Sequence, residues 1–196
     1  MKFQIHTKDT APEASRAMLD ATAKKYGFVP NLYGVLAESP AAVQAYAGIN
    51  KALEQSVLSP VEQQVVTLTV SAANNCTYCM GAHSTVAQMV HMPEQILAEL
   101  RDQRDLSDAK LNALRLLVVS IVHHRGWVPE ADLKQFSAAG YAERQVLDVL
   151  TIVALKTLSN YVNHIAHTPL DPQFAPQAWN AKPATAASVY PAGIVR

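Results

Sequence analysis

The sequence predicts an all-α fold, a helical bundle with short connections. Between about residues 12 and 167 the apolar residues recur at spacings of three and four, as on one face of a helix. No segment shows the alternation of apolar and polar residues that is typical of a strand. Proline falls mostly between the apolar segments, where it separates helices instead of interrupting them.

The apolar pattern divides into nine expected helices. They cover residues 12–26, 30–38, 40–54, 60–74, 76–90, 93–102, 108–125, 130–138 and 142–167. Serine or proline marks several of their starts, at Ser39-Pro40, Ser59-Pro60, Pro93, Ser107 and Pro129. A serine followed by proline favours a helix start, because the serine oxygen accepts a free backbone N–H and proline has no N–H to leave unpaired. Ser59 and Glu62 also fit a capping box.

The pattern predicts one helical domain over residues 1–168 and a C-terminal tail over residues 169–196. The tail is rich in proline and alanine and has few periodic apolar positions, which is typical of an extended segment. Trp179 and Tyr190 favour docking of this tail, because exposed aromatic side chains reduce solubility.

The charges balance, with 16 Lys and Arg against 16 Asp and Glu. This balance argues against partners that are nucleic acids or anionic membranes. Charged residues make up only 16% of the chain and hydrophobic residues 49%, so we expect a well-filled core and a homo-oligomer that buries part of the surface. Met1–Asp9 lacks the apolar stretch of a signal peptide, and Leu116–Val122 is too short to span a bilayer, so we expect a cytoplasmic protein.

Two cysteines and a histidine form the most informative motif, Cys-x-x-Cys-x-x-x-His, at Cys76, Cys79 and His83. Asn74 and Asn75 are typical turn and N-cap residues, which predicts a helix that starts at Cys76. At about 100° per residue, the side chains of the motif then lie within an arc of roughly 60° on one helix face.

This placement favours redox chemistry. The first turn of a helix stabilises a thiolate through its free N–H groups and its positive dipole end. His83 lies one turn after Cys79 and can accept the thiol proton. A thiolate that attacks a peroxide becomes a sulfenic acid, and a neighbouring thiol condenses this acid to a disulfide. Cys76 is near enough to be that neighbour.

Other interpretations of the motif stay open. The cysteines can be small core residues of an apolar helix. They can also bind zinc, with His83 as a third ligand and His164 or His167 as the fourth, in a non-catalytic module. A c-type haem is excluded, because Met80 and not a histidine follows the second cysteine. The sequence gives no reason to expect a bound cofactor or a metal in the redox interpretation.

The motif belongs to a longer pattern, Leu58-Ser59-Pro60-x-Glu62 followed by Val70-Ser71-Ala72-Ala73-Asn74-Asn75-Cys76-Thr77-Tyr78-Cys79-x-x-x-His83. This pattern resembles the signature of the carboxymuconolactone decarboxylase family, in its AhpD-like alkylhydroperoxidase branch. Two later segments also resemble the C-terminal part of peroxidase-related members, Asn160-Tyr161-x-Asn163-His164 and Leu170-Asp171.

The resemblance implies an AhpD-like helical bundle that assembles into a dimer, trimer or hexamer. It implies thiol-dependent reduction of a hydroperoxide substrate in antioxidant defence, with electrons from a dithiol donor such as a lipoyl-bearing protein. By position, Cys79 matches the peroxidatic cysteine, Cys76 its disulfide partner and His83 the histidine of the proton relay. The alternatives are a thiol–disulfide oxidoreductase without peroxidase activity and a lyase like the family's namesake, although lactone decarboxylation does not call for two thiols.

The chain departs from the family pattern at Gln64, where the relay usually has a glutamate. Glutamine can orient a thiol or a water molecule through hydrogen bonds, but it cannot take a proton. Glu62 lies about 200° away round the same helix, so we expect it to cap the helix and not to join the relay. His164 is a further candidate for the pocket, because it belongs to the resembling C-terminal segment.

Overall fold

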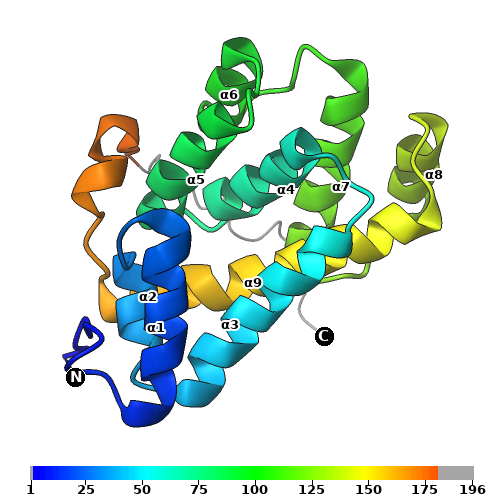
Figure 1. Cartoon of the computed structure of the whole chain (residues 1–196). Coiled ribbons are helices and arrows are strands. Elements are labelled where there is room, and N and C mark those ends of the chain that lie inside the picture. Colours follow the sequence, from blue (N-terminus) through cyan, green and yellow to red (C-terminus); the bar gives the residue numbers. More distant parts are fainter. Residues whose placement is uncertain (1, 181–196) are drawn as a thin grey trace.

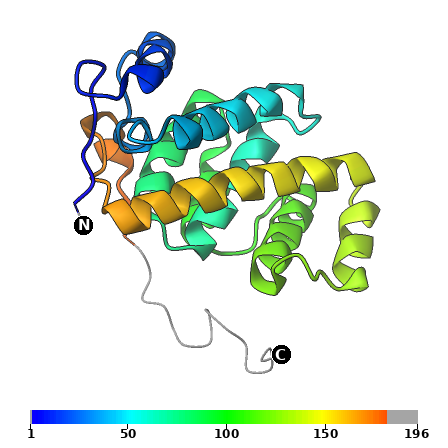
Figure 2. The ribbon, with the colours of Figure 1, turned by 90° about the horizontal axis from the view of Figure 1, so that it is seen from below.

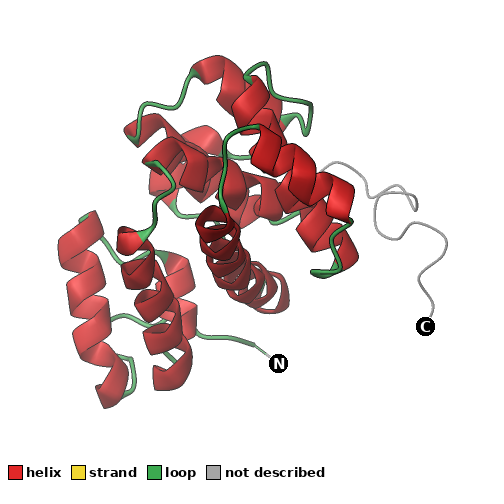
Figure 3. Cartoon of the chain, turned by 90° about the vertical axis from the view of Figure 1, so that its right-hand side faces the viewer, coloured by secondary structure: helices red, strands yellow, loops and turns green. Residues whose placement is uncertain are grey.

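The computed structural model describes residues 2–180, and its regular elements are all helices (Figure 1, Figure 3). In chain order they are α1 (Glu13–Tyr26), α2 (Asn31–Leu36), α3 (Pro40–Ala52), η1 (Leu53–Gln55), α4 (Pro60–Ala73), α5 (Thr77–Met89), α6 (Glu94–Arg101), α7 (Ala109–His124), α8 (Glu130–Ala138), α9 (Glu143–Ala166) and η2 (Pro172–Gln177). The elements η1 and η2 are short 3₁₀ helices. No described residue lies in a strand, which confirms the predicted all-α class.

Two of the predicted serine caps are confirmed. Ser39 accepts a hydrogen bond from the N–H of Ala42 at 3.3 Å, at the start of α3. At the start of α4, the N–H of Ser59 donates to a carboxylate oxygen of Glu62 at 2.8 Å. The N–H of Glu62 donates in turn to the Ser59 hydroxyl at 3.2 Å, which completes the predicted capping box.

The predicted cap of α7 is wrong by one residue. Asp108, and not Ser107, caps this helix, and its carboxylate accepts a hydrogen bond from the N–H of Leu111 at 2.8 Å. A carboxylate suits this position because it also interacts with the positive end of the helix dipole. The Ser107 N–H and hydroxyl instead donate to Glu99, at 2.8 and 3.2 Å.

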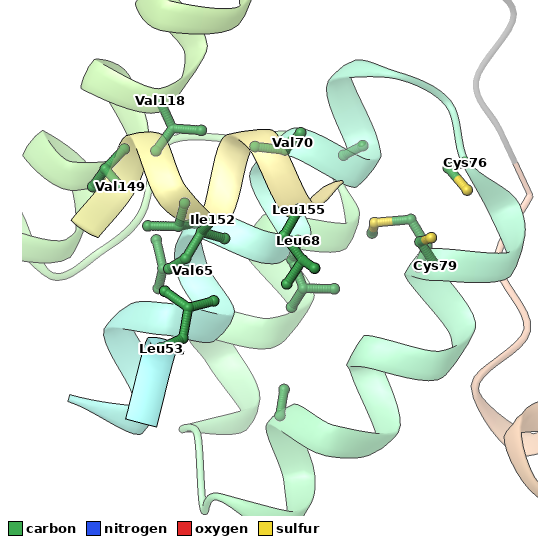
Figure 4. Packing of buried hydrophobic residues seen from close by; sticks show 14 of the residues in the cluster. Leu53, Val65, Leu68, Val70, Cys76, Cys79, Val118, Val149, Ile152 and Leu155 are labelled. Atoms are coloured by element: carbon green, nitrogen blue, oxygen red, sulfur yellow. The ribbon is translucent and has the colours of Figure 1, made fainter. Parts of the chain in front are cut away.

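The core surrounds α4, which packs against α5, α7 and α9. Figure 4 shows aliphatic side chains of η1, α4, α7 and α9 packed together; the labelled ones are Leu53, Val65, Leu68, Val70, Val118, Val149, Ile152 and Leu155. Full burial of each such side chain stabilises the fold by roughly 1.5–3 kcal/mol. Cys76 and Cys79 belong to the same buried cluster, so the core fixes the start of α5.

The described part of the predicted tail packs on the bundle and ends near α6. Residues 172–177 form η2, which lies beside α5 (Figure 1). The indole N–H of Trp179 donates to the carbonyl of Arg101 at 2.9 Å, and the Arg101 guanidinium donates to the carbonyls of Gln177 and Ala178 at 3.1 and 2.9 Å. Trp179 is therefore docked, as predicted, whereas Tyr190 lies outside the described residues.

Within residues 2–180, no helix combines the length and the apolar character needed to cross a membrane.

Candidate active site

A tight turn joins α4 to α5 and places both cysteines at the start of α5. Asn75 adopts a left-handed backbone conformation with φ of 52°, which asparagine tolerates better than most residues. The N–H of Cys76 then donates to the carbonyl of Ser71 at 2.9 Å and closes the end of α4. Cys76 is the N-cap of α5, so the helix starts at Thr77, one residue later than the sequence predicts.

The cysteines are free thiols, each only 1% exposed (Figure 4). The interaction with Cys79 raises the pKa of Cys76, and burial raises it further. Burial alone would also raise the pKa of Cys79. However, a hydrogen bond from Cys76, the charge of Lys156 and the amide groups of Asn163 and Asn160 together lower it well below the ordinary thiol value. Cys79 is therefore the thiol that ionises, and Cys76 remains protonated beside it.

Two buried asparagines of α9 hold the cysteine turn. The side-chain amide of Asn163 donates to the sulfur of Cys79 at 3.3 Å. One turn earlier on α9, the side-chain oxygen of Asn160 accepts a hydrogen bond from the amide of Asn74 at 2.9 Å. An N–H that points at sulfur favours the thiolate over the neutral thiol. These contacts therefore fix the position of the turn and favour ionised Cys79.

Lys156 lies on the same face of α9, one turn before Asn160. Its side chain is fully buried, and its ammonium nitrogen has no hydrogen-bond partner among the described residues. Its positive charge stabilises the thiolate of Cys79 and lowers the pKa of His83. The cysteine pair therefore has a buried cation beside it.

His83 and Gln64 meet, as their positions in the motif and in the relay imply. The Nδ1 atom of His83 lies 3.0 Å from the side-chain oxygen of Gln64 on α4. Because that oxygen only accepts hydrogen bonds, Nδ1 carries the hydrogen and Nε2 is left with a free electron pair. Burial and then the charge of Lys156 hold the pKa of His83 well below its ordinary value, so the imidazole is neutral at physiological pH.

Glu62 caps α4, as predicted. Besides the capping box, its carboxylate accepts a hydrogen bond from the Tyr141 hydroxyl at 2.9 Å and lies 3.6 Å from the ammonium of Lys110. Burial opposes ionisation of Glu62, but the hydrogen bonds from Ser59 and Tyr141 and the charge of Lys110 lower its pKa overall. These partners leave Glu62 engaged at the helix start, away from the Gln64–His83 pair.

His164 is not brought to the cysteine pair. Its side chain is exposed on α9, whereas that of the preceding residue, Asn163, is buried and bonded to Cys79. Successive residues of a helix point about 100° apart, so only one of the two can face the site. Asn163 therefore lies at the site for which His164 was a candidate.

The C-terminal segment lies directly against the cysteine helix. The hydroxyl of Tyr78, between the two cysteines, donates to the carboxylate of Asp171 at 2.6 Å. The same carboxylate accepts a hydrogen bond from the N–H of Asn31 at 3.0 Å and so also ties the segment to α2. At Gly81, a Cβ atom would come within 3.0 Å of Leu170, so the segment approaches closely because this residue is glycine.

The zinc hypothesis lacks a set of ligands in residues 2–180. No group of three or more His, Cys, Asp or Glu side chains there is placed to hold a metal ion. His164 and His167, the candidates for a fourth ligand, are exposed, whereas Cys76 and Cys79 are buried.

Sequence reasoning missed Lys156 and gave Asn160 and Asn163 no role in the site. A usable signal was present, because these polar residues recur at spacings of four and three within the otherwise apolar part of α9. Such spacing places them on one face of the helix. A polar face on α9 was therefore readable from the sequence, but the pattern does not distinguish a buried polar face from a solvent-exposed one.

Part of the chain matches a known protein family. Residues 37–117 match the carboxymuconolactone decarboxylase family, and this range contains α4, most of α7 and all of the Cys-x-x-Cys-x-x-x-His motif. Among curated proteins, none matches the chain at a significant level.

Similar solved structures share the whole fold. One is an uncharacterized peroxidase-related protein with an alkylhydroperoxidase AhpD core from Ralstonia eutropha JMP134, 22% identical, with a TM-score of 0.78 over 88% of this chain and 93% of that chain. Another is a peroxidase-related protein from Silicibacter sp. TM1040, 19% identical, with a TM-score of 0.76 over 90% and 96% of the two chains. A third is a variant of the debrominase Bmp8 in complex with 2,3,4-tribromopyrrole, 14% identical, with a TM-score of 0.75 over 90% and 95%.

At these identities the structures show the fold, and the sequence match to the family is confined to residues 37–117. The chain therefore combines an all-α fold like that of the AhpD core with a segment, residues 37–117, that matches the carboxymuconolactone decarboxylase family and contains the cysteine motif.

Proposed function

We propose that the protein reduces hydroperoxides through the Cys76–Cys79 pair, as a thiol-dependent antioxidant enzyme. One arrangement carries the proposal: Cys79 has a lowered pKa and accepts a hydrogen bond from Asn163, while the protonated Cys76 lies beside it. An ionised thiol is the nucleophile, and a neutral thiol next to it is the group that closes a disulfide.

The reaction follows from these two protonation states. The Cys79 thiolate attacks the terminal oxygen of the hydroperoxide, the O–O bond breaks, and the alkoxide leaves as an alcohol once it has taken a proton. Cys79 is now a sulfenic acid. The Cys76 thiol attacks its sulfur, so that the disulfide forms and water is released. An external dithiol then reduces the disulfide and is oxidised itself.

His83 is placed to move the proton. Because Gln64 holds Nδ1–H, Nε2 is free to accept the proton that Cys79 loses and to pass it to the departing alkoxide. The lowered pKa of His83 favours this second transfer, because a weakly basic imidazole releases its proton readily. Gln64 orients the ring in this scheme and takes no proton itself.

Two further parts of the proposal concern partners. A dithiol carried on a lipoyl-bearing protein is the proposed electron donor, as the family resemblance implies. A homo-oligomer is the proposed form in solution, supported by the exposed apolar side chains of α9, which include Leu147 at 65% and Ile165 at 66% exposure. Two of the similar structures are described as peroxidase-related proteins, which supports the choice of a peroxide as substrate.

The test is peroxide consumption with dihydrolipoamide as reductant. We expect wild type to turn over and Cys79→Ser to fall to the uncatalysed rate. Cys76→Ser should stop after one turnover, with a sulfenic acid on Cys79 that mass spectrometry detects. Thr77→Ser, at an exposed position in the same helical turn, is the matched control and should match wild type.

Each other outcome has a distinct meaning. Unchanged turnover in Cys79→Ser contradicts the assignment of the nucleophile. A Cys76–Cys79 disulfide that forms and exchanges with thiols without peroxide consumption indicates a thiol–disulfide oxidoreductase. If wild type debrominates a brominated pyrrole but turns over no peroxide, the protein is a debrominase, as Bmp8 is named. Lactone decarboxylation that survives loss of both cysteines indicates a lyase.

A further inference from the structure

We infer that Lys156, buried on the face of α9 that meets the cysteine turn, is the charged group that holds Cys79 as a thiolate and so keeps the site reactive. The link to peroxide turnover rests on the proposed function, but the ionisation of Cys79 is a property of the sulfur itself and can be measured without any peroxide.

The position of Lys156 on α9 directs it to the cysteine pair. Lys156, Asn160 and Asn163 follow one another at spacings of four and three and therefore share a face of the helix. That face meets the start of α5, since Asn163 bonds the sulfur of Cys79 and Asn160 bonds Asn74 in the preceding turn. All three side chains are buried, at 0%, 0% and 5% exposure respectively. The lysine therefore points into the protein on the side where the sulfur lies.

The ammonium group has no conventional partner. In residues 2–180, Lys156 forms no ion pair with a carboxylate, and its nitrogen is buried without a hydrogen-bond partner. Buried cations are normally paired, because removing a charge from water costs free energy that a partner must offset. A thiolate at Cys79 is the anion that this position offers. The thiolate therefore gives the buried ammonium an anionic partner, and the ammonium in turn favours ionisation of the thiol.

The other titratable groups around Cys79 cannot supply this charge. They are Cys76, Tyr78 and His83 from α5, Tyr46 from α3 and Lys156 from α9. Tyr46 and Tyr78 have raised pKa values, mainly because they are buried, and so remain neutral. His83 is neutral as well, because burial and Lys156 lower its pKa. Among these groups, Lys156 is thus the only cation.

This role also explains how the site works without the relay glutamate. Gln64 cannot help His83 to remove a proton from Cys79, because an amide takes no proton. The charge of Lys156 makes the thiol itself more acidic, so that less basicity is needed from His83. Lys156 thereby lowers the demand on the Gln64–His83 pair.

The experiment measures the ionisation of Cys79 in a Cys76→Ser background, where it is the sole thiol of the chain. The ultraviolet absorbance of the thiolate is followed against pH, together with the rate of alkylation by iodoacetamide. Lys156→Met should move the midpoint of ionisation upward by at least about one pH unit, so that alkylation at neutral pH slows about tenfold or more. Lys134→Met, which removes an exposed lysine paired with Glu130 on α8, should leave both unchanged.

Methionine matches the length of the lysine stem and suits a buried position, so this variant should fold. Lys156→Gln is the second variant, and thermal unfolding shows that each protein is folded before titration. A midpoint in either folded variant that equals that of the background protein overturns the inference. Both hypotheses can fail separately: an upward shift in the variants with no peroxide consumption by wild type removes only the proposed function. If Lys156→Met leaves both the peroxide turnover and the midpoint of Cys79 ionisation unchanged, only the role of Lys156 is removed.

Discussion

Cys79 combines deep burial with a lowered pKa, and the pH dependence of its reactivity follows from this. A group with a depressed pKa in the folded protein stays ionised as the pH falls through its ordinary range and is protonated only below the folded value. Alkylation of Cys79 in the native protein should therefore be nearly constant over about pH 7 to 9, whereas in the unfolded chain it should fall about tenfold per unit below the ordinary thiol pKa. Mass spectrometry after brief labelling measures both. A native profile that follows the unfolded one contradicts the ionised resting state.

A carboxylate at position 64 should strengthen the proton relay. In Gln64→Glu the new carboxylate accepts the Nδ1–H of His83, raises the pKa of this histidine and makes its Nε2 a better base. We expect peroxide turnover with dihydrolipoamide to rise, by up to about tenfold. Gln44→Glu adds the same charge at an exposed position of α3 and should leave the rate at the wild-type value. A rate in Gln64→Glu at or below that of the control would show that basicity at His83 does not limit the reaction.

The sequence predicted part of this site because part of it is local. Cys76, Cys79 and His83 lie within eight residues on one helix, so spacing alone places them together. Gln64 was found from its position in the family pattern. Lys156 and Asn163 come from α9, some eighty residues later, and their neighbours in sequence are exposed or packed elsewhere. Only the packing of α9 against α5 brings them to the sulfur, and single-sequence periodicity does not contain that information.

At the level of single elements, we expect Glu62 to stabilise the start of α4 and to take no part in proton transfer. Glu62→Gln weakens the capping box and the contact with Lys110, and we expect the free energy of unfolding to fall by about 1 kcal/mol. Because the pKa of Glu62 is lowered on folding, this contribution is full above the ordinary glutamate pKa and is lost as the pH falls through the folded value.

Chemical denaturation at neutral and at acidic pH measures this difference, which should shrink at acidic pH. Alkylation of Cys79 should be the same in Glu62→Gln as in wild type. Glu54→Gln, at an exposed glutamate of η1, is the control for loss of a negative charge. A slower alkylation in Glu62→Gln alone would place this carboxylate in the relay after all.

Asp171 ties the segment after α9 to α5 and α2. Its carboxylate accepts hydrogen bonds from Tyr78 and Asn31, and bonds to a charged acceptor contribute about 1.5–3 kcal/mol each. Asp171→Asn should therefore allow the segment to open more often and increase the labelling rate of the cysteines by a bulky aromatic disulfide about tenfold. Asp20→Asn, at an exposed position of α1, should change nothing. Unchanged labelling in Asp171→Asn would show that the thiols are reached by another route.

At the scale of the whole molecule, α9 is a central helix with one apolar face left uncovered. Its buried face includes Val149, Ile152 and Leu155, whereas Leu147, Leu150, Tyr161 and Ile165 are exposed, at 65%, 40%, 54% and 66%. These exposed residues recur at helical spacings along the outer side of α9, which no other helix covers in Figure 2. A continuous apolar stripe of this kind is typical of a surface that another protein covers.

We expect this stripe to bury against a second copy of the chain. Leu147→Glu places a charge in it at an exposed position, so the fold should be unaffected while the mass in sedimentation equilibrium falls toward that of the monomer. Met89→Glu, at a methionine of α5 that is 72% exposed, is the control and should sediment as wild type does. A monomeric wild type, or an oligomer that Leu147→Glu leaves intact, would contradict this interface.

The same helix shows what periodicity predicts about a fold and what it does not. The spacing of apolar residues predicted that residues 142–167 are helical, because an isolated helix already has this period. It did not show which side of α9 lies in the core, since both Ile152 and Leu150 belong to apolar stripes. Which stripe is buried depends on α4 and α7, whose contacts with α9 are set by the whole chain. The positions of the helices can thus be predicted from the sequence, whereas which side of a helix is buried cannot.

The depth of the cysteine pair has a consequence for the shape of its redox partner. Because each thiol at the start of α5 is only 1% exposed, a rigid globular donor cannot bring a surface thiol within bonding distance of these sulfurs. A dithiol at the end of a long, thin side arm can reach them, as a small hydroperoxide can. Burial therefore favours electron donors that are narrow enough to reach the sulfurs. It also protects the cysteine pair from exchange with bulky disulfides and thiols.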